Sequence, residues 1–364
     1  MLYHLLYSFK DINPFFNVFR YITFRSVLAA VTAFLISIIL GPFIIKKLAE
    51  CKIVQQIRGS DVSAPLHDMH KDKAGTPTMG GIVILLSILT AVFLWGELNN
   101  RYVFFTLLVM VWLGIAGFID DYIKLKLKRS KGLGILAKFI MQCSIGIVIG
   151  FLAYCDPNLS TRLDVPFFKN IVLNLGIFYI VFVTVVIVGA SNAVNLTDGL
   201  DGLAIGCTIM VALAYSVLCY VSGHAIFSTY LFIPHIPGTS ELAVICASIV
   251  GAGLGFLWFN CHPASVFMGD IGSLSLGGAL GVVAVFIRKE LLLMIVGGIF
   301  VMEALSVILQ VASYRLRNGK RIFKCSPLHH HFQMLGWHEN KIIVRFWIVG
   351  AILAVLTLMT LKLR

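Results

Sequence analysis

Ten apolar stretches, each roughly 17–24 residues long, leave this chain little choice of fold, since about 20 such residues form a helix that crosses a bilayer. The chain is 59% hydrophobic and only 13% charged, which is more apolar surface than a soluble domain of 364 residues can bury. We therefore expect an all-α polytopic integral membrane protein with about ten transmembrane helices. The stretches lie at about 24–45, 80–96, 102–119, 135–154, 171–190, 203–222, 241–258, 271–287, 291–313 and 342–361.

The sequence has no internal repeat, low-complexity tract or linker, so we expect residues 1–364 to form a single membrane domain. Residues 1–23 are rich in aromatic side chains and contain an Asn-Pro pair, which predicts a segment at the membrane interface. Residues 24–361 would then hold the ten helices. The ninth stretch contains a glycine pair at 297–298 and Glu303, so its helix can break there.

Lysine and arginine are concentrated in the odd-numbered loops, counting each loop by the helix that precedes it. Loops 46–79, 120–134 and 314–341 carry six, five and six of them. Basic residues favour the cytoplasmic side, so we expect odd loops in the cytoplasm and both termini outside. The net charge of +12 then reflects topology and contact with anionic membrane lipids, and we expect no nucleic acid partner.

Asp120 and Asp121 stand side by side at the end of the stretch 102–119, in a chain with only 17 acidic residues. Like-charge repulsion and partial desolvation make such a pair unfavourable unless a cation relieves it. A divalent metal ion is the simplest candidate. The alternative is a solvated helix end in which both acids pair with the nearby lysines 124, 126 and 128.

Polar segments with chemically capable side chains occur in all five odd loops and hardly at all in the even ones. Seven of the ten histidines also lie in odd loops. A single active site on the cytoplasmic face, assembled from five loops, explains this distribution. The segments are His70–Gly81, Asp120–Lys124, Asn192–Gly202, Asn260–Asp270 and Pro327–Phe332.

In the fifth loop, Asn192, Asn195, Asp198 and Asp201 recur every three residues, which would place them on one face of a helix. Gly199 would let a ligand approach the backbone. The alternative is a turn between two helices. A turn needs only two or three such residues, so a row of four favours function.

The seventh loop offers an aromatic ring and another carboxylate. Phe267 could stack on a ligand, although a membrane-interface anchor is an equally good interpretation. Asp270 precedes an apolar run, where it could cap a helix or bind a metal. Asn260 opens the same segment.

Basic groups suited to phosphate occur in the first and last of these loops. Lys71 and Lys73 precede a Gly/Thr-rich turn, which favours contact with phosphate oxygens but has no Walker A pattern. Imidazole is a phosphate partner and proton shuttle near pH 7, so the three histidines at 329–331 suit the same chemistry. Adventitious metal binding is the alternative for that triplet.

Carboxylates, lysines and histidines without an activated serine or cysteine are typical of Mg²⁺-assisted phosphoryl transfer. Their position at the ends of membrane helices indicates that one substrate is a lipid phosphate. The other substrate would then arrive from the cytoplasm.

Five motifs in this order resemble those of the polyprenyl-phosphate N-acetylhexosamine-1-phosphate transferase superfamily, and the likeness covers essentially the whole chain. Three of the motifs are AspAspxxLys (120–124), AsnAlaValAsnLeuThrAspGlyLeuAspGlyLeuAla (192–204) and ValPheMetGlyAspxGlySer (266–273). The other two are HisLysxLysxGlyThrProThrMetGlyGly (70–81) and the HisHisHis triplet (329–331). These last two motifs point to the muramoyl-pentapeptide branch of the superfamily. One departure is Gln333, where glutamate is the commoner family residue.

This resemblance implies that UDP-N-acetylmuramoyl-pentapeptide and undecaprenyl phosphate react, with Mg²⁺, to give UMP and undecaprenyl-diphosphoryl-N-acetylmuramoyl-pentapeptide, without ATP. It implies a homodimer in the bacterial inner (cytoplasmic) membrane. Asp270 is the preferred metal ligand, with Asp120 and Asp121 beside the metal, and His329 joins these aspartates as a catalytic residue. The implied substrate-binding residues are Lys73, Thr78, Lys124, Lys138, Asn192, Asn195, Asp198, Gly199, Asp201, Asn260, Phe267, Gln310, His330 and His331.

Two alternatives on mechanism and function stay open at this point. The transfer could be a single displacement in which Asp120 orients or deprotonates the lipid phosphate, or a two-step route with an aspartyl-phosphate intermediate in which Asp270 is the nucleophile. The donor could be UDP-N-acetylglucosamine, as in the sister branch. A secondary transporter for an anionic solute would instead need polar groups near mid-membrane, such as Glu303, and repeated halves.

Overall fold

The structure is a computed structural model and describes residues 2–51, 53, 75–127, 132–166 and 172–362. It confirms the predicted all-α polytopic membrane fold. Within these residues, nine helices are long and apolar enough to cross a membrane. They are α2 (Ile22–Glu50), α5 (Arg101–Lys126), α6 (Ile135–Cys155), α7 (Phe178–Thr197), α8 (Leu203–Gly223), α10 (Leu242–Asn260) with the preceding turn η4 (Thr239–Glu241), α11 (Gly269–Phe286), α13 (Gly298–Leu316) and α15 (Glu339–Met359).

The remaining apolar stretch forms α4 (Gly81–Trp95), which has 15 residues and is therefore short for a spanning helix. The ninth stretch is broken, as its glycine pair predicted, into α12 (Glu290–Val296) and α13. The fifth begins later than expected, because its first residues belong to a small antiparallel sheet. Strand β1 (Arg162–Asp164) pairs there with β2 (Val172–Asn174).

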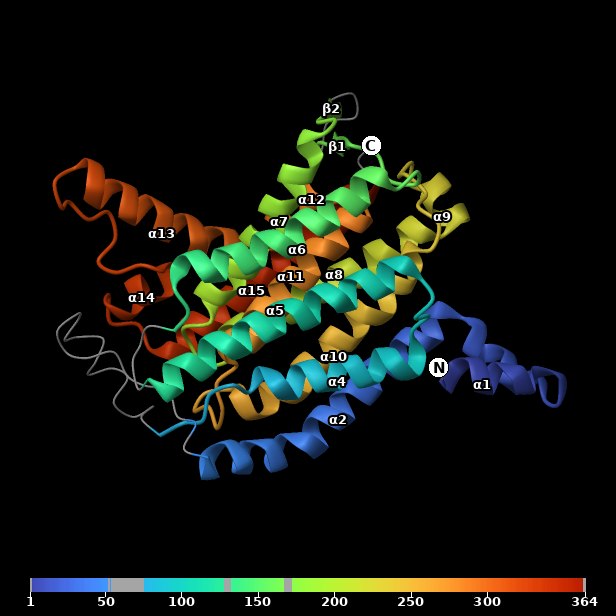
Figure 1. The fold of residues 1–364 in the computed structure, drawn as a ribbon, viewed down its shortest axis with the longest axis horizontal. Helices are drawn as coiled ribbons and strands as arrows, with labels where there is room; N and C mark the ends of the chain where they lie inside the picture. Colours follow the sequence, from blue (N-terminus) through green and yellow to red (C-terminus); the bar gives the residue numbers. More distant parts are fainter. Residues whose placement is uncertain (1, 52, 54–74, 128–131, 167–171, 363–364) are drawn as a thin grey trace.

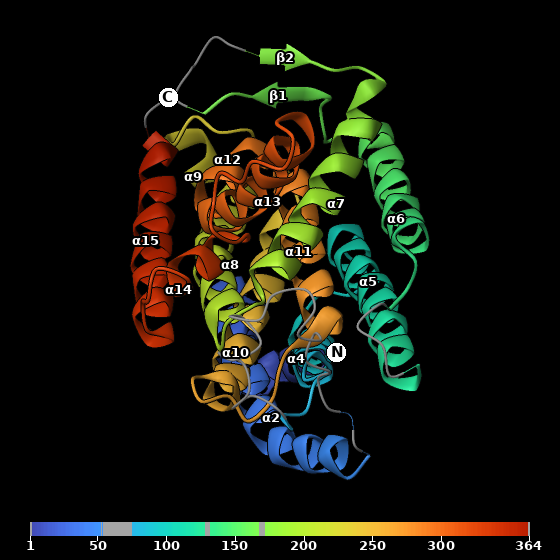
Figure 2. The same ribbon diagram turned by 90° about the vertical axis from the view of Figure 1, so that its left-hand side faces the viewer.

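The long helices run side by side across the molecule, and α13 leans away from the bundle (Figure 1). Helices α8, α10 and α11 are mostly buried, whereas most of α2, α6 and α15 lies at the surface. Surface residues on these outer helices are largely aliphatic and aromatic, as expected for contact with lipid. The polar segments gather at the end of the bundle where α5 and α10 finish and α6 and α11 begin, which is on the left in Figure 1 and faces the viewer in Figure 2.

The N-terminal segment lies at the opposite end of the bundle (Figure 1). It forms α1 (Leu2–Ser8) and the turns η1 (Phe9–Asp11) and η2 (Pro14–Arg20). The buried Arg25 guanidinium lies 2.9 and 2.5 Å from the Glu241 carboxylate oxygens and 4.2 Å from the centre of the Tyr3 ring. These contacts attach α1 to α2 and η4. Placement of this segment at the membrane interface stays a prediction.

Three short elements complete the described chain. They are α9 (Ala225–Tyr230), α14 (Leu328–Gln333) and η5 (Thr360–Lys362). Helix α14 carries the histidine triplet and lies beside α13 at the end of the bundle that holds the polar loops (Figure 1).

Candidate functional site

Three carboxylates meet between the end of α5 and the start of α11. Asp120 and Asp121 lie in the last two turns of α5, and Asp270 lies in the first turn of α11. One oxygen from each lies within 4.8 Å of one from the others. Asp120 and Asp121 are only 3% and 5% exposed, so they do not form a solvated helix end, although both pair with Lys124 as that alternative expected.

Gly117 allows the two helices to approach closely enough to form this cluster. It lies about one turn before Asp120, and a Cβ atom there would be 2.3 Å from the backbone oxygen of Asp270. Any larger residue would therefore push α5 away from the start of α11. The site depends on backbone contact as well as on its charged side chains.

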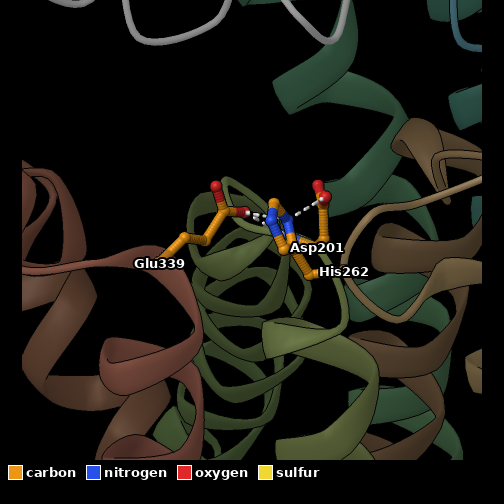
Figure 3. Close-up of side chains that lie close together, drawn as sticks. All are labelled: Asp201, His262 and Glu339. Carbon is orange, nitrogen blue, oxygen red and sulfur yellow. Dashed lines mark hydrogen bonds and ion pairs between the residues drawn. The ribbon is translucent and has the colours of Figure 1, made fainter.

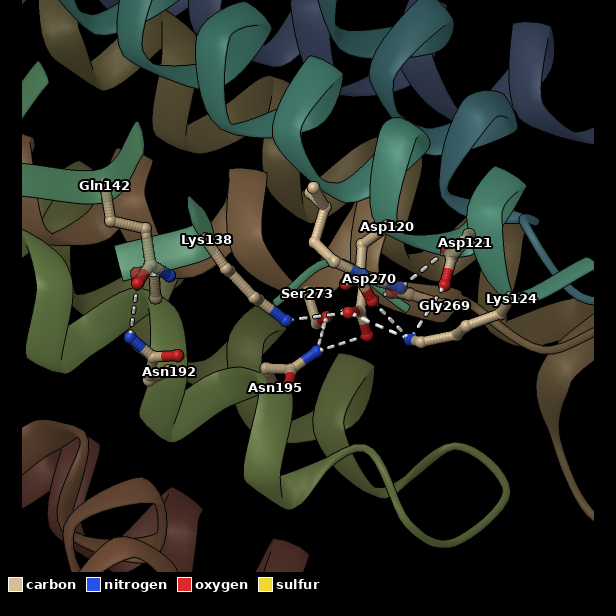
Figure 4. A network of polar contacts seen from close by, with 12 residues as sticks. Asp120, Asp121, Lys124, Lys138, Gln142, Asn192, Asn195, Gly269, Asp270 and Ser273 are labelled. Carbon is tan, nitrogen blue, oxygen red and sulfur yellow. Dashed lines mark hydrogen bonds and ion pairs between the residues drawn. The ribbon is translucent and has the colours of Figure 1, made fainter. Parts of the chain in front are cut away.

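Two lysines lie among the carboxylates (Figure 4). Lys124 Nζ is 2.5 Å from Asp120 Oδ2, 3.3 Å from Asp121 Oδ1 and 3.1 Å from Asp270 Oδ2. Lys138 Nζ, from α6, is 2.7 Å from Asp270 Oδ2. When all three carboxylates are ionised, they outnumber the two ammonium groups by one negative charge, which an additional cation would neutralise.

Hydrogen bonds fix the orientation of Asp270. Asn195, in the last turn of α7, donates from Nδ2 to Asp270 Oδ1 at 2.7 Å and to Ser273 Oγ at 2.8 Å. The Asp270 backbone N–H donates to Asp121 Oδ2 at 2.9 Å. The Asp270 carboxylate thus faces Asn195 and the two lysines, so its contacts favour a role in the site over simple helix capping (Figure 4).

The predicted helical row in the fifth loop is only half correct. Helix α7 ends at Thr197, and Gly202 has a φ of +76°, so Asp198 and Asp201 lie in the turn that follows. The aspartate and glycine residues at 198–202 favour a turn, and they prevent α7 from continuing. Asn192 remains on α7 and donates from Nδ2 to Gln142 Oε1 at 2.9 Å, away from the carboxylates.

Asp198 is the fourth carboxylate near the cluster. Burial and the neighbouring charges of Asp270 and Asp121 raise its pKa to about 8. A carboxyl group with this pKa is largely protonated at neutral pH unless a cation or a donor approaches it. This environment would make a bound cation or a substrate hydroxyl group favourable beside Asp198.

A second polar group lies nearby, made of Asp201, His262 and Glu339 (Figure 3). His262 Nδ1 is 2.9 Å from Asp201 Oδ2 and 3.9 Å from Glu339 Oε1. Their ligand atoms also lie within 4.8 Å of one another, so this group too could hold a cation. Asn260 Oδ1 accepts the Gly202 N–H at 3.0 Å, which joins the turn after α7 to the end of α10.

The first and seventh loops are joined through their backbones. The Phe267 N–H donates to Pro77 O, and the Gly80 N–H donates to Phe267 O, both at 2.8 Å. The Phe267 side chain is partly exposed, and Thr78 lies beside Gly269 in the same region. Lys73 lies outside the described residues.

The histidine triplet does not point in one direction. His329 is fully buried beside Glu303, His330 Nδ1 lies 2.7 Å from Gln333 Oε1, and His331 Nδ1 accepts the Lys324 N–H at 3.1 Å. Gln310 is engaged as well, because its amide bonds the backbone of residues 322 and 323. Substrate contacts for His330, His331 and Gln310 stay predictions, since protein groups contact Nδ1 of each histidine and both polar atoms of the Gln310 amide.

Several residues of the site did not stand out in the sequence. Ser273 follows Asp270 by one helical turn and could have been found from that spacing. Gln142, His262 and Glu339 gave no such signal, because their partners are distant in the chain. Glu303 was noted only as an acid within an apolar stretch.

This arrangement suits the handling of phosphate at a membrane surface. Ammonium groups can bind phosphate oxygens, and a cation held by the carboxylates would neutralise further charge. The site lies where membrane helices end, so it could receive one substrate from the lipid and another from water.

Comparisons with known proteins agree with this geometry. The glycosyl transferase family 4 model matches residues 103–288, and phospho-N-acetylmuramoyl-pentapeptide-transferase signature 1 matches residues 73–85. Enzymes named phospho-N-acetylmuramoyl-pentapeptide-transferase from Geobacter sp. (strain M21), Thermodesulfovibrio yellowstonii and Desulforapulum autotrophicum are 53%, 51% and 50% identical to the chain. Each alignment covers 100% of both proteins.

Proposed function

The chain belongs to the phospho-N-acetylmuramoyl-pentapeptide-transferase family, and we propose that it transfers phospho-N-acetylmuramoyl-pentapeptide from UDP-N-acetylmuramoyl-pentapeptide to undecaprenyl phosphate. The products are UMP and lipid I, the lipid-linked intermediate of peptidoglycan synthesis. The observation that supports this most strongly is the cluster of three aspartates and two lysines at the ends of membrane helices.

The carboxylates of Asp270, Asp121 and Asp120 are the groups that would hold Mg²⁺. An all-oxygen ligand set with an excess negative charge fits that ion. When bound, the ion supplies charge neutralisation for the transferred phosphoryl group. Asn195 fixes the direction of the Asp270 carboxylate, so the ligand set is held in place before substrates bind.

Lys124 and Lys138 bind the phosphate oxygens in this proposal. Each contacts Asp270 in the structure, and their ammonium groups can turn toward phosphate when substrates and a metal ion arrive. Both substrates are anionic, so these lysines also reduce the repulsion between them.

The transfer proceeds as a single displacement. An oxygen of the lipid phosphate attacks the sugar-bearing phosphorus of the donor, and the bond from that phosphorus to the bridging oxygen breaks as UMP leaves. Asp120 orients the attacking phosphate or accepts its proton. In the alternative route, Asp270 would attack the same phosphorus as UMP leaves, and the lipid phosphate would then attack the resulting aspartyl phosphate; Asp270 Oδ2 faces both lysines in the structure.

The uridine end of the donor lies toward the turn after α7 in this proposal. Asp201 and Asn260 supply hydrogen-bonding groups there, and Phe267 supplies an aromatic face for the uracil. The backbone bonds of Phe267 and Gly80 support that assignment, because they hold this face beside the first loop.

We place the enzyme in the bacterial inner membrane, with the site facing the cytoplasm and both termini outside. The excess of lysine and arginine in loops at the site's end of the bundle supports this orientation. UDP-linked donors are cytoplasmic metabolites, which agrees with it. We further propose that the chain works as a homodimer.

An assay with purified protein tests the proposal. Protein, Mg²⁺ and undecaprenyl phosphate are incubated with UDP-N-acetylmuramoyl-pentapeptide or with UDP-N-acetylglucosamine, and UMP and lipid products are measured. We expect UMP and lipid I with the first donor only. UMP with the second donor would indicate the sister activity, and no product with either would contradict transferase function.

A further inference from the structure

Glu303 is a fully buried carboxylate that the proposed reaction does not use. It lies on α13 with an exposure of 0%, the same value as its neighbour His329. An ionised or polar side chain so deep in an apolar bundle is unfavourable unless its partners satisfy it. The groups that contact the Glu303 carboxylate therefore indicate its role.

Both oxygens of Glu303 contact the start of α14. Oε2 accepts the Leu328 N–H at 2.6 Å, and Oε1 accepts the His329 N–H at 3.2 Å. The first N–H groups of a helix have no partner within the helix itself, so the carboxylate supplies acceptors that α14 lacks. Glu303 thus fixes where the histidine-bearing helix begins and how it is rotated.

The same carboxylate also contacts the His329 ring. Nδ1 lies 3.2 Å from Glu303 Oε1. Among the described residues, neither ring nitrogen has a partner in full hydrogen-bond geometry. A carboxylate beside Nδ1 favours the tautomer with its proton on Nδ1, as in other histidine–carboxylate pairs.

The opposite nitrogen faces the turn that follows α7. A Cβ atom on Gly199 would lie 2.2 Å from His329 Nε2, so the ring is packed directly against the Gly199 backbone. Gly199 adjoins Asp198, whose pKa is affected by Asp270 and Asp121. Within the part of the chain that the structure describes, His329 Nε2 is thus a buried polar atom without a hydrogen-bond partner, beside the turn that carries Asp198.

We propose that Glu303 is a positioning residue for the transfer reaction, holding His329 with Nδ1 toward itself and Nε2 toward the Gly199 turn. This inference rests on the proposed function and adds a residue that acts through another. Glu303 does not touch substrate. It sets the place, rotation and tautomer of His329, whose Nε2 lies against the turn that carries Gly199 and Asp198.

Kinetics of Glu303→Gln, His329→Gln and the double variant test this role. The glutamine in Glu303→Gln has the same size but replaces one acceptor oxygen with a donor, so α14 and the ring lose their fixed arrangement. We expect a fall in kcat of about tenfold or more with a KM for the nucleotide changed by about twofold at most. The double variant should be no slower than the slower single variant, because both changes remove the same function.

Glu290→Gln is the matched control. Glu290 is also a buried carboxylate, and it accepts the Tyr179 hydroxyl at 2.6 Å outside the site. Its substitution should leave kcat near the wild-type value. A wild-type kcat in Glu303→Gln, or multiplying effects in the double variant, would overturn the proposal.

A spectroscopic measurement keeps the proposal testable if Glu303→Gln does not fold. Histidine is labelled with ¹⁵N in the wild-type protein, and the His329 signals are identified by their loss in His329→Gln. We expect a proton on Nδ1; a proton on Nε2 alone would refute the proposal. This result does not depend on turnover, whereas absence of UMP release by the wild-type protein would refute the proposed function instead.

Discussion

At the scale of single residues, Asp270 makes the contacts that define the site. Its carboxylate meets Lys124, Lys138 and the Asn195 amide, and its backbone N–H bonds Asp121. These partners come from three other helices. The contacts of Asp270 therefore form only when α5, α6 and α7 are all correctly placed around the start of α11.

Asp198 should make the protein less stable as the pH rises. Its pKa is raised to about 8 in the folded state by burial and by Asp270, against about 4 in an unfolded chain. Below pH 4 the group is neutral in both states. Between pH 4 and pH 8 only the unfolded state loses the proton, so stability falls across this window.

Asp198→Asn removes that titration and should raise the melting temperature by a few degrees at pH 7, with little effect near pH 4. The measurement is thermal unfolding in detergent without divalent cations. The same variant should lose transferase activity, because stabilising an active site commonly costs function. A variant that melts lower than wild type at pH 7, or a difference that does not grow with pH, would contradict this explanation.

The sequence predicted the residues whose partners follow a simple spacing or a familiar motif. Asp120, Asp121 and Asp270 were found in this way, and the structure brings them together. His262 and Glu339 were missed because they meet Asp201 only after chain segments far apart in sequence have folded together. Their contacts are a property of tertiary structure, which spacing within one segment does not encode.

At the scale of elements, the contact of α5 with the start of α11 sets the geometry of the site. We expect Gly117→Ala to lower activity by about tenfold or more, because the added Cβ would lie 2.3 Å from the Asp270 backbone. The rate of UMP release by Gly117→Ala, compared with the wild-type rate, measures this loss of activity. The accompanying loss of stability should be about 1–3 kcal/mol, as for other overpacked contacts.

Gly189→Ala is the control for this prediction. Gly189 also lies within a membrane helix, α7, but apart from its own stretch of helix no atom of the described residues lies within 4 Å of the position where its Cβ would be. The alanine there should leave activity near the wild-type value. Equal activity of the two variants would show that close approach of α5 and α11 is not required.

Helices were the easiest elements to predict, because length and hydropathy alone specify a membrane span. Their ends were harder. Helix α7 begins at Phe178 since the residues before it pair in a small sheet, and it continues to Thr197, so Asn192 and Asn195 are helical. Pairing between β1 and β2 depends on backbone hydrogen bonds between two short segments, which hydropathy does not report.

At the scale of the whole molecule, the helices serve to bring five polar segments to one end of an apolar bundle. Charged groups are unfavourable within the bilayer, so a site at the helix ends can meet a lipid phosphate without burying its charges in hydrocarbon. The presence of polar segments in all five odd loops predicted this common location, and the described parts of the five segments lie at that end, on the left in Figure 1. Spacing within one segment could not predict which carboxylates meet, since this depends on how helices cross; the family resemblance supplied that expectation.

The most direct test asks whether the Asp120, Asp121 and Asp270 cluster holds a metal ion against the donor's phosphates. Mn²⁺ serves as a paramagnetic substitute for Mg²⁺, and pulsed electron paramagnetic resonance detects ³¹P nuclei of UDP-N-acetylmuramoyl-pentapeptide close to it. We predict ³¹P coupling in the wild-type protein and in Glu290→Gln, and its loss in Asp270→Asn. Unchanged Mn²⁺ affinity and ³¹P coupling in Asp270→Asn would contradict the account.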